Sequence, residues 1–93
     1  MKEYKLAVPD SVILVIRKMH PHLKKKIRFS LRMIMKNPVE GKELRAELHG
    51  LRSFSVGRLR IIYRVRTNVI EIVAIGPRSS IYLETLLLLK KEK

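Results

Sequence analysis

The spacing of apolar residues changes along this chain, and that change restricts the fold more than any other feature. Between residues 12 and 34, apolar residues recur at intervals of three and four, which is typical of helices that pack by one face. From residue 53 onward they alternate with polar residues, which is typical of strands. The chain has no internal repeat, linker or low-complexity segment. We therefore expect one α+β domain over residues 1–93.

Two helices are expected in the first part of the chain. Asp10 or Ser11 is the expected N-cap of the first helix, which ends before His20-Pro21. The second runs from about residue 22 to 36 and ends at Asn37-Pro38. Because only a short turn separates them, they should form an antiparallel helical hairpin.

Four strands are expected around this hairpin. The first occupies residues 2–8 and ends at Pro9. A polar connector with one helical turn follows the hairpin, over residues 39–50. Short turns then join the other three strands into an antiparallel meander. These three strands are expected at residues 53–56, 59–66 and 69–75.

A terminal helix completes the expected order β-α-α-β-β-β-α. Ser79 or Ser80 should cap it, and Lys90, Lys91 and Lys93 should favour its C-terminal end. Leu86 to Leu89 point in all directions around such a helix, so the sheet can cover only one side. We expect a partner chain on the other side; the alternative is a segment that stays mobile until bound.

The expected core follows from the same periodicities, with one face of each helix and strand buried. Its members are Leu6, Val8, Val12, Ile16, Leu23, Ile27, Leu31, Ile34, Phe54, Ile61, Tyr63, Ile72 and Ile75.

The chain is strongly basic, and its charge is unevenly distributed along the sequence. Lys and Arg number 21 against 8 Asp and Glu, a formal net charge of +13. The acid-free stretch between Glu47 and Glu71 contains arginine but no lysine, and a guanidinium can grip a phosphate bidentately. We therefore expect a polyanionic partner, either nucleic acid or an acidic protein; the alternative is a solvated basic surface. The arginines of this stretch are Arg52, Arg58, Arg60, Arg64 and Arg66.

Several classes of function have no motif in this sequence. Cysteine is absent, which excludes thiol and disulfide chemistry. There is no HExxH, P-loop or GxGxxG motif, so we expect no metal and no cofactor. His20 and His22 flank a proline turn, and only His49 precedes the arginine-rich strands. With no long apolar run and mixed charges at the N-terminus, we expect a cytoplasmic protein that does not bind membranes.

The arginines suit one reaction in particular. RNA supplies its own nucleophile, the 2′-hydroxyl, so a protein can cleave it by positioning the phosphodiester, stabilising developing charge and moving protons. Arg60 would bind the scissile phosphate, a second arginine would stabilise the transition state, and a tyrosine would move a proton or stack on a base. The alternative is that Arg60, Arg64 and Arg66 lie on an exposed sheet face and bind nothing.

Two segments, GKELRAELHGLRSFSVGRLRIIYRV and IEIVAIGPRSSIY, resemble the RelE/ParE superfamily of bacterial and archaeal toxin components, and the RelE-like branch in particular. The resemblance covers nearly the whole chain. Its specific parts are Leu48 with Gly50, the arginine strand from Arg58 to Val65, and the Ile75-Gly76-Pro77-Arg78 step followed by Tyr82. It implies a helical hairpin packed on a small twisted antiparallel sheet, whose other side is a concave basic cleft.

The resemblance also implies an activity. RelE-like members cut mRNA on the ribosome without metal, through 2′-hydroxyl attack, and leave a 2′,3′-cyclic phosphate and a 5′-hydroxyl. By position, Arg60 matches the phosphate-binding arginine, Arg78 the transition-state arginine, and Tyr82 the tyrosine near the C-terminus. The expected RNA-binding residues are Arg52, Arg58, Arg64, Lys25 and Arg28.

This chain departs from the family on the strand before the arginines. Catalytic members place basic side chains where this sequence has Ser53 and Ser55, and a serine hydroxyl without an activating base accepts a proton poorly. Arg52, Arg58 or His49 could partly compensate. The accessory candidates are His49, Ser53 and Ser55. The alternatives are a weakened ribonuclease, a ParE-like inhibitor of DNA gyrase, or a module that only binds its antitoxin. In the family the antitoxin is a small, often acidic protein that wraps the toxin and competes with its terminal helix.

Overall fold

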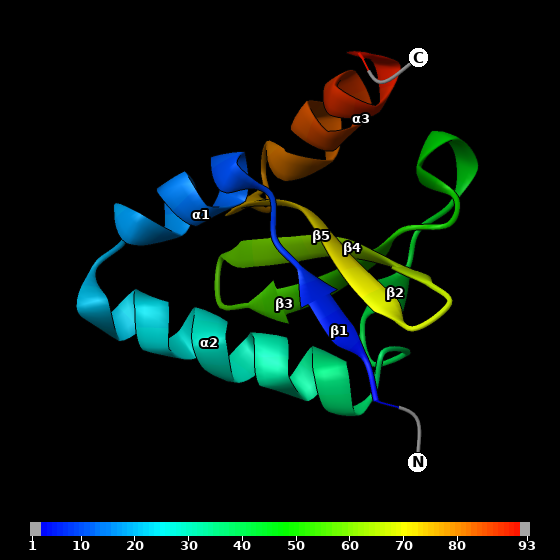
Figure 1. The fold of residues 1–93 in the computed structure, drawn as a ribbon. Coiled ribbons are helices and arrows are strands. Elements are labelled where there is room, and N and C mark those ends of the chain that lie inside the picture. The colour runs from blue at the N-terminus through cyan, green and yellow to red at the C-terminus, as the bar shows by residue number, and fades with distance from the viewer. Residues whose placement is uncertain (1–2, 92–93) are drawn as a thin grey trace.

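One five-stranded sheet organises the molecule, with two helices on one face and a third helix at the other (Figure 1). This computed structural model describes residues 3–91, so the expectations for Lys2 and Lys93 lie outside the described residues. The elements in chain order are β1 (Lys5–Ala7), α1 (Asp10–Arg17), α2 (Pro21–Lys36), β2 (Lys42–Glu43), a 3-10 turn (Ala46–Leu48), β3 (Arg52–Val56), β4 (Leu59–Arg66), β5 (Val69–Pro77) and α3 (Ile81–Lys91).

The expected α+β class and the helical hairpin on a small sheet are confirmed, but two details of the sheet differ. β1 runs parallel to β5, with Leu6 opposite Ile70, whereas all the other pairs are antiparallel. The hairpin between β1 and the later strands provides the crossover that a parallel pair requires. The connector contains a short strand, β2, in addition to its helical turn, and Lys42 pairs with Ser53. The sheet is therefore mixed rather than wholly antiparallel.

The helix starts also differ from the sequence expectation. Pro9 occupies the N-cap position of α1 without a side-chain hydrogen bond, so neither Asp10 nor Ser11 is the cap. α2 begins one residue early, at Pro21, because the fixed φ of proline suits a first helical position. The His20 Nδ1 caps it by accepting a hydrogen bond from the His22 N–H at 3.2 Å. Before α3, the Ser80 carbonyl accepts from the Glu84 N–H at 3.1 Å.

The main core lies between the helical hairpin and the sheet. Seven of the thirteen expected core residues are fully buried, and the others lie at its margin, where one side of the side chain meets solvent. The buried ones are Val12, Ile27, Ile34, Ile61, Tyr63, Ile72 and Ile75. The half-buried ones are Leu6, Val8, Ile16, Leu23, Leu31 and Phe54.

Tyr63 links this core to the connector. Its hydroxyl donates to the Pro38 carbonyl at 2.7 Å and accepts from the Gly41 N–H at 2.9 Å. Burial raises the pKa of Tyr63 above its ordinary value, so the phenol stays protonated and can donate. The connector is therefore held to the sheet by polar contacts that the sequence periodicity does not reveal.

A second, smaller core lies on the opposite face, where α3 packs. Ile62 and Ala74 from the sheet meet Ile81 there, while Thr85 is also buried on α3. Ile62 is opposite Ala74 but Tyr63 is opposite Ile72, so Val73 is an extra residue in β5. This bulge lets Val73 and Ala74 both pack into the second core.

The leucine-rich helix is covered on one side only, as expected. Leu83, Leu87 and Leu88 are exposed at 63%, 52% and 44%. Leu86 and Leu89 are half-buried. None of the helices in residues 3–91 is long and apolar enough to cross a membrane.

Candidate functional site

An open cleft of about 680 Å³ lies where the β3–β4 turn meets the end of β5. Leu59 is paired with Pro77 and Arg60 with Gly76, and the Arg58 carbonyl accepts a hydrogen bond from the Arg78 N–H at 2.9 Å. The strand pairing thus brings together arginines that are distant in sequence. The cleft is lined by Gly57, Arg58, Arg60, Pro77, Arg78 and Ser79.

The cleft is basic, and no carboxylate is among its lining residues. Arg58 and Arg78 are exposed, whereas Arg60 is half-buried. The Arg60 Nη1 donates to the Gly57 and Leu59 carbonyls, both at 2.8 Å, so its guanidinium is held at the turn. Gly57 has a φ of +59°, which glycine adopts without strain. The remaining donors of three arginines can serve an anion in this cleft.

Tyr82 lies on the same face of the sheet but does not line the cleft. Its hydroxyl is 3.1 Å from the Oγ of Ser53, which is buried. Ser53 is opposite Ile62, whereas Ser55 is opposite Arg60, so Tyr82 sits about 7 Å along the sheet from the row of Arg60. In this arrangement the Tyr82 hydroxyl has a protein partner.

Gly76 lets the start of α3 approach the sheet. A Cβ at this position would lie 2.9 Å from the Cδ1 of Ile81, closer than real side-chain contacts allow. The start of α3 therefore packs directly on Gly76, with the end of the Ile81 side chain in the space that a Cβ would need. In the sequence Gly76 is part of the Ile75-Gly76-Pro77-Arg78 step, and its contact with Ile81 is visible only in the fold.

Arg52, one of the expected RNA-binding residues, does not line the cleft. Its Nη1 donates to the Gly41 carbonyl at 2.8 Å and the Val39 carbonyl at 3.2 Å. On β3, Arg52 shares its face with Phe54, which packs in the main core, and not with Ser53. Arg52 therefore secures the connector.

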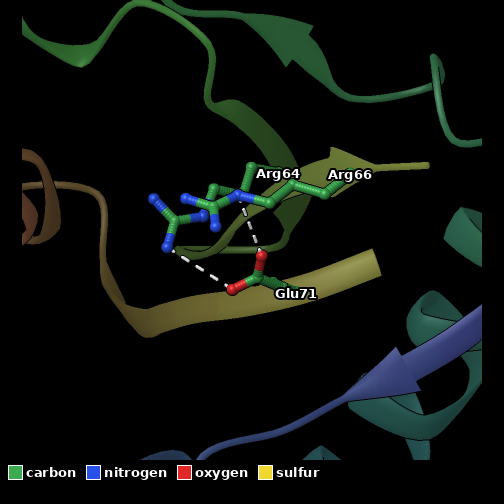
Figure 2. A network of polar contacts seen from close by, with 3 residues as sticks. All are labelled: Arg64, Arg66 and Glu71. Atoms are coloured by element: carbon green, nitrogen blue, oxygen red, sulfur yellow. Dashed lines mark hydrogen bonds and ion pairs between the residues drawn. The ribbon is translucent and has the colours of Figure 1, made fainter. Parts of the chain in front are cut away.

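The other expected RNA-binding residues are spread over the molecule. Arg64 lies further along β4, where it and Arg66 contact Glu71 (Figure 2). Lys25 and Arg28 are exposed on α2, which covers the opposite face of the sheet from α3. Of that set, only Arg58 joins Arg60 and Arg78 in the cleft.

The accessory candidates are not grouped either. His49 is exposed at the end of the 3-10 turn and does not line the cleft. Ser53 is engaged by Tyr82, and Ser55 is exposed on the stretch of β3 beyond its pairing with β2. Within residues 3–91, no group of three or more His, Asp or Glu side chains is arranged to hold a metal ion.

A family model described as the ParE toxin of a type II toxin-antitoxin system, parDE, matches residues 8–82. A search of the curated proteins gave no match. Several solved structures share the fold. A mutant of the Escherichia coli toxin RelE in the free state has a TM-score of 0.75 at 16% identity, covering 91% of this chain and 95% of that one.

Two further structures are similar over most of their length. The Mycobacterium tuberculosis toxin-antitoxin complex RelBE2 has a TM-score of 0.73 at 24% identity, covering 86% of this chain and 97% of that one. The YoeB/ParE toxin from Agrobacterium tumefaciens has a TM-score of 0.70 at 19% identity, covering 80% and 98%. At these identities the likeness establishes the fold.

Proposed function

We propose that this chain, which belongs to the ParE toxin family of type II toxin-antitoxin systems, acts as a cytoplasmic, metal-independent endoribonuclease that cleaves mRNA on the ribosome. The observation that carries the proposal is the meeting of Arg58, Arg60 and Arg78 in one cleft without a lining carboxylate. Such a cleft favours a phosphodiester, whose charge increases in the transition state.

The proposed reaction uses the 2′-hydroxyl of the RNA as nucleophile. Arg60, which the turn carbonyls hold in place, binds the scissile phosphate, and Arg78 stabilises the charge that develops on it. The new bond joins the 2′-oxygen to phosphorus, and the bond to the 5′-oxygen breaks. The products are a 2′,3′-cyclic phosphate and a 5′-hydroxyl, and Tyr82 is the candidate for proton transfer or base stacking.

An antitoxin is the proposed protein partner. Several proteins of the same fold were solved as toxin-antitoxin complexes, among them RelBE2 and the archaeal RelE-RelB complex. The net charge of +13 favours an acidic partner, and the exposed Leu83, Leu87 and Leu88 give it an apolar surface to cover. The same partner would neutralise the toxin by covering the cleft.

A specific observation favours a second candidate, inhibition of DNA gyrase. The matching family model carries the ParE name, and the strand opposite Arg60 offers the hydroxyls of Ser53 and Ser55 in place of basic groups. Without an evident general base the chain could also be a weak ribonuclease, or a module that only binds its antitoxin.

Primer extension on an mRNA in a reconstituted translation reaction tests the proposal. We expect codon-phased cuts with the intact protein and a loss of about a hundredfold or more in cleavage with Arg60→Ala and Arg78→Ala. Arg17→Ala is the matched control, because Arg17 is an exposed arginine on α1 that does not line the cleft. Absence of cuts with the intact protein would overturn the ribonuclease proposal. A gyrase supercoiling assay would then test the second candidate.

A further inference from the structure

Arg64, Arg66 and Glu71 form a polar cluster at the end of the sheet away from the cleft (Figure 2). Nη2 of Arg64 lies 3.4 Å from one carboxylate oxygen of Glu71, and Nε of Arg66 lies 3.1 Å from the other. Two guanidinium groups therefore share one carboxylate, which leaves a local excess of positive charge. Figure 2 shows both guanidinium groups beside the carboxylate of Glu71.

The carboxylate of Glu71 orients the two guanidinium groups but accepts from few of their N–H donors. Each carries five N–H donors, and each contacts the carboxylate through a single nitrogen. The Nε of Arg64 is buried and has no hydrogen-bond partner among the described residues. The side chain of Arg64 is 21% exposed and that of Arg66 is 64% exposed, so solvent reaches the cluster. A single carboxylate thus leaves most of the donors free for a second anion.

This cluster lies on the same face of the sheet as the cleft. Along β4, Arg60, Ile62 and Arg64 alternate with Ile61 and Tyr63, which face the main core. Glu71 is opposite Arg64. Arg64 is four residue steps along β4 from Arg60, roughly 13 Å at about 3.3 Å per step. Between them the face carries Ile62 and the half-buried ring of Tyr82, an aromatic surface on which a base can stack.

We propose that Arg64 and Arg66 form a second phosphate-binding site, which holds the backbone of the same RNA strand at a distance from the scissile phosphate. The carboxylate of Glu71 occupies this site when RNA is absent and gives up part of its contact when a backbone phosphate arrives. This inference rests on the proposed function, because it assumes that the strand enters the Arg60 cleft. The role of the cluster is to fix the position of the RNA strand relative to the cleft.

Binding of graded 2′-O-methyl oligouridines tests the second site, because they lack the free hydroxyl needed for cleavage. Fluorescence anisotropy at several salt concentrations gives both the affinity and its salt dependence. With oligomers long enough to span both sites, Arg64→Gln and Arg66→Gln should each weaken binding. Each should also lower the slope of log affinity against log salt by about 0.7, one phosphate contact on a single strand. With oligomers too short to span both sites, neither substitution should change the affinity. Arg60→Gln should weaken binding at every length.

Glu71→Gln provides a test with the opposite sign. It removes the competing carboxylate, so it should strengthen the binding of the long oligomers only. Weaker binding in this variant would overturn the exchange of carboxylate for phosphate. Arg66 is largely exposed, so Arg66→Gln should fold even if Arg64→Gln does not. Arg17→Gln, on the exposed surface of α1, is the control for general loss of charge.

The outcomes separate this inference from the proposed function. If Arg60→Gln weakens binding while Arg64→Gln and Arg66→Gln match Arg17→Gln at every length, the second site is wrong and the cleft stands. If the intact protein does not bind the oligomers, or Arg60→Gln also matches Arg17→Gln, RNA binding in the cleft is wrong and the second site is wrong with it.

Discussion

At the scale of single residues, the connector before β3 depends on one phenol and one glycine. The Tyr63 hydroxyl bonds both Pro38 and Gly41, and Arg52 donates to the carbonyl of the same glycine. A Cβ at Gly41 would lie 2.5 Å from the Tyr63 oxygen and 2.8 Å from its Cε1. Because Tyr63 is fully buried, its ring has little freedom to move away. Glycine is therefore required at this position for space.

Gly41→Ala should lower the free energy of unfolding by about 1–3 kcal/mol, the usual cost of forcing extra atoms into a packed region. Urea unfolding monitored by circular dichroism measures the change. Tyr63→Phe removes the nearest atom, so the loss in Gly41→Ala/Tyr63→Phe should be smaller than the sum of the two single losses. Strict additivity would show that the two residues do not press on each other.

At the scale of elements, α3 is covered by the sheet on one side only. Ile81 and Thr85 are its fully buried residues, and three of its leucines are exposed. The Thr85 hydroxyl is buried without a hydrogen-bond partner among the described residues, which costs stability. A helix anchored by few buried residues, one of them poorly satisfied, is suited to a surface that a partner chain covers.

Thr85→Val should raise the free energy of unfolding by about 1 kcal/mol, because it removes the buried hydroxyl while keeping nearly the same shape. Thr85→Ala is the matched control. It removes the same hydroxyl and also a methyl group, so it should gain less or lose stability. Thermal unfolding of the three proteins measures the differences. A Thr85→Val protein less stable than the parent would mean that the hydroxyl makes a stabilising contact.

At the scale of the whole molecule, charge repulsion opposes the compact state. The chain carries a net charge of +13, and the two salt bridges found in residues 3–91 both involve Glu71. Salt therefore has many repulsive interactions to screen and few attractive ones. The same excess charge would attract RNA or an acidic antitoxin, so the property that favours the proposed partners also lowers the stability of the free chain.

Raising NaCl from low concentration to about 0.15 M should raise the melting temperature, since the Debye length falls to about 8 Å. Each kcal/mol of repulsion that is screened should add about 4–8 °C for a domain of this size. Differential scanning calorimetry measures the shift. A sodium sulfate series at equal ionic strength is the control for anion binding. A melting temperature that falls with NaCl would show that attractive pairs dominate.

The sequence alone determined the elements that repeat a pattern. The helical hairpin, the β3–β4–β5 meander and the buried faces represented by Ile27, Ile61 and Ile72 follow from spacing, because a regular element places its apolar side chains at regular intervals. The proximity of Arg58, Arg60 and Arg78 also follows largely from local features of the sequence. A short turn and strand pairing bring these arginines to one end of the sheet.

Tertiary structure alone decided what depends on contacts between distant residues. The parallel pairing of β1 with β5 and the presence of β2 depend on strand edges that other elements leave open, which no local pattern encodes. Arg52 donates to two carbonyls of the connector, a contact that no spacing in the sequence indicates. A side chain's partner depends on which elements become neighbours, and long-range packing makes that choice.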